Sequence, residues 1–195
     1  MTVAQIEEKK AKKKSVAQNL WFLHWLMAAF FLLLFATGAY MTDLPKKVSY
    51  GESLYEFHKT LGVVVMSVLL ARIVVLLLVI QHKYRRRLPK LRGEWLKTFA
   101  FHTSLYLFMV VVPLSGYFCS NSYGYDVVIF GTGITLPDIF PENKEVAEFS
   151  KSLHFWLAYT FLGAIALHAI DQWKYLRSQM RRFYTAVKPN TATNK

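Results

Sequence analysis

Four long runs of apolar residues, separated by polar stretches, dominate this sequence. They cover residues 19–41, 54–80, 98–118 and 152–173. Each is near or above the roughly 20 residues that an α-helix needs to cross a hydrocarbon layer about 30 Å thick. Pro113 inside the third run is compatible with a membrane helix, because neighbouring helices can satisfy the carbonyl that it frees. The pattern predicts an all-α fold, a transmembrane four-helix bundle, without a repeat or a second domain.

The polar stretches are expected to lie outside the membrane. Residues 1–18 are a lysine-rich arm that we expect to be loosely ordered or to lie on a membrane surface. Residues 81–97 are dense in lysine and arginine, and residues 174–195 form a basic tail with a disordered-looking end. The longest connection, residues 119–151, holds five carboxylates. Within it we expect a short surface helix near residues 143–149.

The composition supports this prediction. The chain is 54% hydrophobic and has a formal net charge of +12. Nucleic-acid binding would be one use for so much positive charge, but the basic residues flank apolar runs and do not cover a polar domain, which argues against a nucleic-acid partner. The first run is too long for a signal peptide, so we interpret it as a retained span. Cys119 is the only cysteine, so no disulfide within the chain and no cysteine cluster is expected.

The distribution of charge predicts the orientation. The arm, the loop 81–97 and the tail hold 18 lysines and arginines, whereas the connections and helix ends on the other side hold five. The positive-inside rule then places both termini in the cytoplasm and the connections 42–53 and 119–151 outside. The outer side carries a net charge of −3.

Four of the six histidines fall into two pairs when they are placed on this topology. His24 and His168 lie at the cytoplasmic level, and His58 and His154 lie at the outer level. His154 and His168 are 14 residues apart, about four helical turns or 21 Å, so one helix would present a histidine at each level. Two neutral imidazoles that face each other inside a bundle suit a six-coordinate haem iron. The alternative for any one of them is an amphipathic residue at a membrane boundary.

The remaining polar residues leave alternatives open. His102, also at the cytoplasmic level, could replace His24 as a ligand or bind a quinone carbonyl, and His82 is most simply a solvated boundary residue. Arg72 could pair with a haem propionate or polarise a quinone, or it could extend to the inner surface. Gly38 and Gly62 could each clear a helix face beside a flat macrocycle at the outer level, or serve only helix packing.

The joint order and spacing of several short motifs resembles the bacterial cytochrome b561 family over nearly the whole chain. These motifs are Leu23-His24-Trp25, His58-Lys59-Thr60-Leu61-Gly62 with Arg72, His102-Thr103-Ser104-Leu105-Tyr106 leading to Pro113-Leu114-Ser115-Gly116, Leu136-Pro137, Leu153-His154 and Leu167-His168-Ala169. The resemblance implies a four-helix membrane bundle with two b-type haems. It implies His24 and His168 as ligands of the inner haem iron, His58 and His154 as ligands of the outer one, and His102 near a quinone.

The sequence also departs from the family pattern at the cytoplasmic face. Relatives often carry another histidine pair after the last ligand, where this chain reads Ala169-Ile170-Asp171-Gln172-Trp173, and the amino-terminal arm is longer than expected. Asp171 is either a partner of the histidine one turn before it or the solvated end of the helix. The residues Phe155 to Leu167, especially Gly163 and Ala164, are expected to separate the two haems.

Bis-histidine ligation leaves no open position on iron, which predicts one-electron transfer. We expect electrons to pass between the outer face and a quinone or a redox partner at the cytoplasmic side of a bacterial inner or other energy-transducing membrane. Within the resemblance, alternatives are a superoxide:quinone oxidoreductase, against which the negative outer side argues mildly, and a haem-bearing membrane anchor of a larger redox complex. A haem-free structural or assembly subunit is the alternative of a different class.

Overall fold

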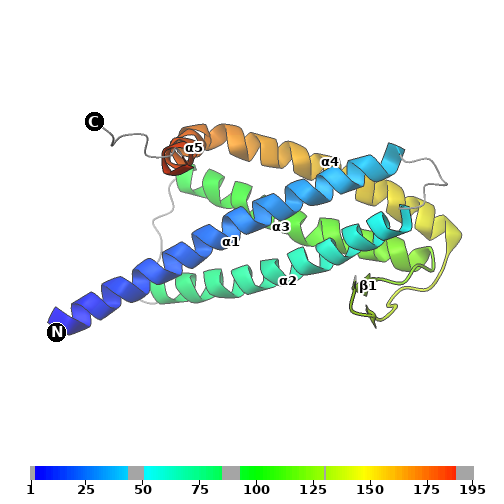
Figure 1. Cartoon of the computed structure of the whole chain (residues 1–195), viewed down its shortest axis with the longest axis horizontal. Coiled ribbons are helices and arrows are strands. Elements are labelled where there is room, and N and C mark those ends of the chain that lie inside the picture. Colours follow the sequence, from blue (N-terminus) through cyan, green and yellow to red (C-terminus); the bar gives the residue numbers. More distant parts are fainter. Residues whose placement is uncertain (1–2, 44–50, 85–92, 130, 188–195) are drawn as a thin grey trace, which may run out of the picture.

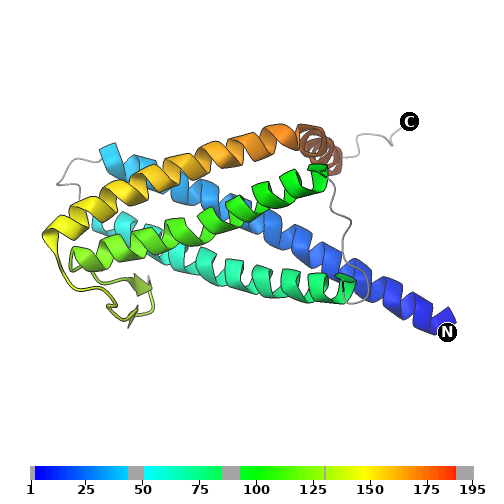
Figure 2. The ribbon, with the colours of Figure 1, turned by 180° about the vertical axis from the view of Figure 1, so that it is seen from behind.

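The computed structural model describes residues 3–43, 51–84, 93–129 and 131–187, and it is almost entirely helical. Four long helices run side by side along its longest axis (Figures 1 and 2). In chain order the elements are α1 (Val3–Asp43), α2 (Gly51–Tyr84), α3 (Gly93–Ser122), β1 (Val128–Ile129), β2 (Ile134–Thr135), α4 (Lys144–Asp171) and α5 (Trp173–Val187).

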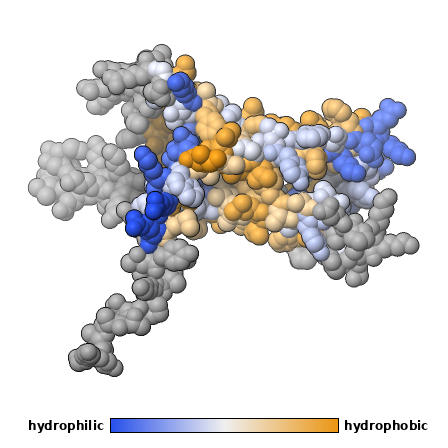
Figure 3. Space-filling view, turned by 90° about the horizontal axis from the view of Figure 1, so that it is seen from above, coloured by the Kyte–Doolittle hydropathy of each residue, from blue (hydrophilic) through white to orange (hydrophobic). Residues whose placement is uncertain are grey.

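Each long helix contains a stretch long and apolar enough to cross a membrane. These stretches are Gln18–Thr42, Gly51–Gln81, Trp95–Ser122 and Lys144–Asp171. In hydrocarbon a backbone must satisfy its own hydrogen bonds, which an α-helix does within one segment. Most side chains of these stretches are not buried inside the protein, and Figure 3 shows an apolar band between two polar ends. The predicted fold class, an all-α transmembrane four-helix bundle, is confirmed.

The helices do not all pack equally closely. α1 packs on α2 and α3 packs on α4, while α2 contacts α3 more sparsely. In the described part of the chain, the backbone of α4 does not pack closely on α1 or on α2. Contact across these two interfaces therefore depends on long side chains.

The centre of the bundle is filled by one cluster of apolar side chains around Phe161. Phe161 of α4 is fully buried, and its ring centre lies 5.0 Å from that of Phe31 on α1 and 5.8 Å from that of Phe108 on α3. Val65 and Leu69 of α2 belong to the same buried cluster, as do Met27, Leu105 and Val112. All four long helices thus meet at mid-height through side chains that contain no hydrogen-bonding group.

The structure corrects two expectations about the polar stretches. α1 begins at Val3, so most of the amino-terminal arm continues the first membrane helix and is not loosely ordered. The short surface helix expected near residues 143–149 is the start of α4, whose N-cap Asn143 accepts hydrogen bonds from the backbone N–H groups of Glu145 and Val146. The tail begins as a regular helix, α5. Residues 44–50, 85–92 and 188–195, which include parts of the predicted loops and the end of the tail, lie outside the described residues.

The long connection between α3 and α4 contains an antiparallel hairpin that the sequence analysis missed. β1 and β2 pair Val128 with Thr135, and Gly131 and Gly133 adopt the positive φ values that the turn between them requires. The hairpin region is attached to the first turns of α2, because Lys59 Nζ donates a hydrogen bond to the carbonyl of Asp126 at 2.6 Å. This connection therefore covers one end of the bundle.

Substitution Phe161→Ala should open a cavity at the point where all four helices meet. We expect it to lower the free energy of unfolding by about 3–5 kcal/mol, as is usual for a buried phenylalanine. Denaturant titration of the purified protein in detergent, followed by circular dichroism, measures this change. Phe22→Ala is the matched control, because Phe22 is exposed on α1 and its removal leaves no cavity. Equal losses in both variants would contradict a packing role for Phe161.

Candidate functional site

The two histidine pairs lie across the two interfaces where the backbones do not pack closely. His24 of α1 contacts His168, which lies near the end of α4 that leads into α5. His58 of α2 is next to Lys59, which contacts the hairpin region, and His154 of α4 contacts Ser115 near the end of α3 that leads to the hairpin. α4 thus provides one histidine to each pair. We call His24 and His168 the inner pair, and His58 and His154 the outer pair, after the levels predicted from the sequence.

Neighbouring groups determine which ring nitrogen of His154 carries the hydrogen. His154 Nδ1 lies 3.1 Å from the carbonyl oxygen of Val112, which can only accept, so Nδ1 carries the hydrogen. The Ser115 hydroxyl donates its own hydrogen to the same carbonyl at 2.7 Å and can therefore accept from His154 Nδ1 at 2.9 Å. The lone pair of His154 is left on Nε2, the nitrogen available to a metal.

His58 has a similar arrangement on the other side. The Thr37 hydroxyl lies 2.8 Å from both the carbonyl of Leu33 and His58 Nδ1, and when it donates to the carbonyl it accepts from Nδ1. Nε2 of His58 is then also free of hydrogen. Both rings of the outer pair are therefore oriented by hydroxyl groups and carry a free lone pair.

Small residues flank both outer imidazoles. A Cβ atom built on Gly116 would lie 3.0 Å from Cε1 of His154, and one on Gly38 would lie 3.3 Å from Cε1 of His58. Gly38 is one of the two glycines predicted to leave space for a macrocycle at this level. Beside the other histidine, His154, the corresponding small residue is Gly116, which was not predicted. Gly62, the other glycine predicted there, has nothing within 4 Å of its Cβ position and faces open space among the described residues.

The spacing of the inner pair fits a metal ion between two rings. A metal–imidazole bond is about 2 Å long and the ring centre lies about 1.2 Å behind the bonded nitrogen, so two rings on opposite sides of one metal have centres roughly 6–6.5 Å apart. The ring centres of His24 and His168 are 6.3 Å apart. His102 lies closer to His168, at 5.4 Å, and is exposed. This geometry favours His24 over His102 as the partner of His168.

His168 also has an unsatisfied group. Its Nδ1 is buried and has no hydrogen-bond partner among the described residues. A buried nitrogen of this kind is costly and indicates a missing ion, water or ligand. Asp171, considered above as a partner for His168, instead accepts a hydrogen bond from Gln172 Nε2 at 2.7 Å and is exposed.

Arg72 lies beside the inner pair and inside the bundle. Its Nε donates to the Tyr106 hydroxyl at 3.0 Å, and its Nη1 lies 3.3 Å from His24 Nδ1. A guanidinium group can only donate, so the His24 nitrogen that faces it is an acceptor. If His24 bound iron through Nε2, its Nδ1 would carry the hydrogen and Arg72 would have to turn to another acceptor.

The levels are separated by the Phe161 cluster. Phe161 lies within the Phe155–Leu167 segment that was expected to separate the haems. Gly163, singled out within that segment, is exposed, while Ala164 packs against the core. Among the described residues no three or more His, Cys, Asp or Glu side chains gather as a metal site. A haem iron needs only two protein ligands, so the pairs fit haem better than they fit a protein-bound metal ion.

Sequence analysis assigned no role to the residues that orient the histidines. Thr37 and Ser115 are hydroxyl residues inside apolar spans, and Tyr106 is the only phenol near Arg72 among the described contacts. A polar side chain in a membrane span is itself a signal, because it needs a partner there. That signal does not identify the partner, since each contact joins two helices that are far apart in sequence.

Comparisons with known proteins agree with the geometry. Residues 19–171 match the family described as prokaryotic cytochrome b561. Cytochrome b561 homolog 2 of Escherichia coli (strain K12) is 26% identical over 158 residues, which cover 78% of this chain and 79% of that protein. The match includes all four membrane helices and both histidine pairs. This chain therefore belongs to the prokaryotic cytochrome b561 family, multi-pass bacterial membrane proteins that bind haem b and transfer electrons.

Proposed function

We propose that this chain holds two b-type haems and passes electrons between the outer face of a bacterial membrane and a quinone or redox partner protein at the cytoplasmic side. The observation that carries the proposal is the division of four histidines into two pairs, each completed by α4. Haem bound between two imidazoles supplies one-electron chemistry without an open position on iron.

Each pair would hold one haem in a way that its surroundings support. His58 and His154 would ligate the outer haem through Nε2, since hydroxyl groups engage both Nδ1 atoms. His24 and His168 would ligate the inner one, at a ring spacing of 6.3 Å. The loose packing of α4 on α1 and on α2 supports this assignment, because a flat macrocycle has to lie between the helices that ligate it.

The orientation in the membrane is part of the proposal. α1 begins and α4 ends at the same end of the bundle, which is the end that carries α5 (Figure 1). The basic arm, loop and tail hold 18 lysines and arginines, against five toward the hairpin end. The positive-inside rule favours a cytoplasmic location for the basic end.

His102 is the residue we propose for contact with the quinone. Its Nδ1 donates to the carbonyl of Thr98 at 2.8 Å, so Nε2 of the neutral ring is an acceptor that suits a quinol hydroxyl. The protonated ring could instead donate to a quinone carbonyl. The side chain is exposed and 5.4 Å from the ring of His168, which would place a quinone beside the inner haem.

The number of haems tests the proposal most directly. Purified protein from cells with sufficient haem should give a b-type reduced-minus-oxidised spectrum and two haems per chain in a pyridine haemochrome assay. A single haem would contradict the two-site assignment, and no haem would favour the structural-subunit alternative.

Alanine substitution of the ligands should remove the haems selectively. We expect His58→Ala and His154→Ala each to lose the outer haem, and His24→Ala and His168→Ala each to lose the inner one, since one imidazole cannot hold a six-coordinate iron. His102→Ala is the matched control and should keep both haems. Redox titration followed by optical spectroscopy identifies the haem that remains. Loss of a haem in His102→Ala but not in His24→Ala would show that the inner pair is wrong.

Arg72→Gln should lower the reduction potential of the inner haem while both haems stay bound. A buried cation stabilises the reduced state, which carries one positive charge fewer, so its removal disfavours reduction. We expect a fall on the order of 60 mV, tenfold in the one-electron equilibrium. Potentiometric titration measures it. Lys59→Gln, at the other end of the bundle, should leave the inner potential unchanged, and a shift of the same size there would contradict a local effect of Arg72.

A further inference from the structure

The helix α5 is chemically unlike the four membrane helices. Its 15 residues include four basic residues and no acidic one. The apolar residues Trp173, Leu176 and Met180 recur at spacings of three and four, which places them on one side of the helix. A basic helix with one apolar side is typical of segments that lie in the interface between lipid and water.

The position of α5 agrees with this chemistry. It begins two residues after the apolar span of α4 ends, and it crosses the end of the bundle so that Figure 1 shows it almost end-on. The long axis of the bundle is the direction in which the spans cross the membrane. A helix that runs across this axis at the end of a span lies along the membrane surface.

A side-chain contact ties α5 to α1. Trp21 of α1 donates its indole N–H to the Tyr175 hydroxyl of α5 at 3.0 Å. Successive residues of a helix are about 100° apart, so Trp173 and Arg177, each two residues from Tyr175, project from the opposite side of α5.

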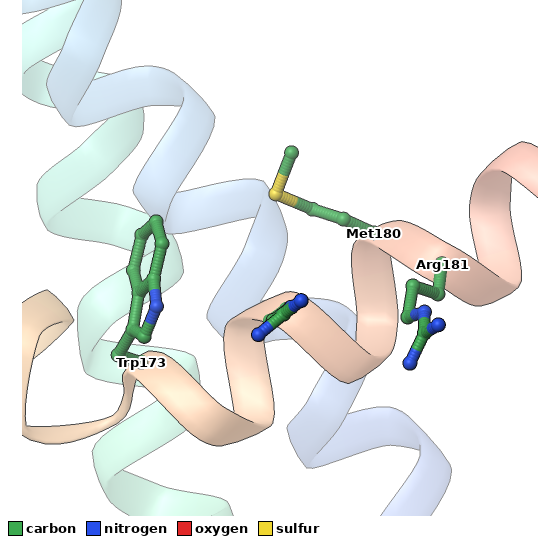
Figure 4. A pocket seen from close by; sticks show the side chains of 4 residues that line it. Trp173, Met180 and Arg181 are labelled. Carbon is green, nitrogen blue, oxygen red and sulfur yellow. The ribbon is translucent and has the colours of Figure 1, made fainter.

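On the exposed side of α5, two arginines lie between apolar and polar residues. Arg177 and Arg181 line a hollow of about 290 Å³ together with Trp173 and Met180 (Figure 4). The same two arginines line a second hollow of about 420 Å³ together with Lys174 and Ser178. The pair of guanidinium groups thus stands between an apolar edge and a polar edge of one helix.

We propose that α5 binds the headgroups of anionic phospholipids, with Arg177 and Arg181 as the main contacts to the phosphate. Guanidinium groups bind phosphate oxygens in a bidentate manner, and each basic residue near an anionic membrane surface adds to the attraction. Trp173 and Met180, both about half exposed, enter the adjacent apolar layer, where an indole ring is favoured. Lys174 and Ser178 contact the solvated side of the headgroup.

The lipid is a better occupant than a soluble anion or an acidic protein. α5 follows a membrane span without a linker, so phospholipid phosphates are always present at its level, whereas a soluble partner would have to be recruited. The apolar edge beside the arginines matches the layer below the phosphates and has no counterpart in an inorganic anion. This inference concerns α5 alone and does not depend on the number of haems or on the quinone.

The test uses the full-length, haem-loaded protein in phosphatidylcholine bilayers that contain a trace of spin-labelled lipid. Electron paramagnetic resonance gives the fraction of that lipid immobilised by the protein. We expect wild-type protein to prefer labelled phosphatidylglycerol over labelled phosphatidylcholine, and Arg177→Gln/Arg181→Gln to reduce this preference by about threefold or more, since each basic residue contributes roughly fivefold at most. The variant should keep the haem spectrum of the wild type.

Two further variants separate binding at α5 from general charge and from misfolding. Lys9→Gln/Lys10→Gln removes the same charge from the basic end of the chain and should change the preference much less. Arg177→Lys/Arg181→Lys keeps the charge but loses the bidentate contacts, so it should retain more of the preference than the glutamine variant and less than wild type. The proposal is overturned if wild type shows no preference for phosphatidylglycerol, if the glutamine variant of α5 keeps the full preference, or if the arm variant loses as much.

Discussion

An imidazole inside a hydrocarbon layer has no water to bond, so each of its nitrogens must find a partner within the protein. The outer pair meets this requirement through hydroxyl groups that donate their own hydrogen to a backbone carbonyl and then accept from Nδ1. Both rings are thereby fixed with Nε2 available. At the inner pair the requirement is only partly met, because Arg72 faces His24 Nδ1 while Nδ1 of His168 has no hydrogen-bond partner among the described residues. The two sites are therefore not equivalent, although each is a histidine pair.

The need for polar groups to find partners inside the protein also bears on which helices pack closely and which do not. α1 with α2 and α3 with α4 pack closely through apolar side chains, while the interfaces of α4 with α1 and α2 are bridged by the histidines and by Phe161. Helices in lipid gain no hydrophobic energy by associating, so groups that satisfy one another across an interface carry much of the specificity. α4 is the helix on which the arrangement of both sites depends, because it completes each pair.

The spans could be predicted from the sequence, because the thickness of a membrane sets the length of an apolar helix. The levels of the histidines could be predicted too, because the rise per residue of a helix sets how deep each residue lies. The sequence did not reveal that Thr37 faces His58 or that Ser115 faces His154, since those contacts depend on how helices rotate against each other. The hairpin around Gly131 and Gly133 and the helix α5 were missed for another reason. Their patterns are short, and the polar composition around them is equally typical of loops and tails.

The buried centre of the bundle has a consequence for what can cross it. The buried members of the Phe161 cluster are all apolar side chains, which cannot pass a proton from one to the next. An electron does not need such a path. Under the proposed function, each electron that passes this cluster would carry negative charge across the membrane without a proton passing through the same side chains. The rate of transfer would then depend on the membrane voltage.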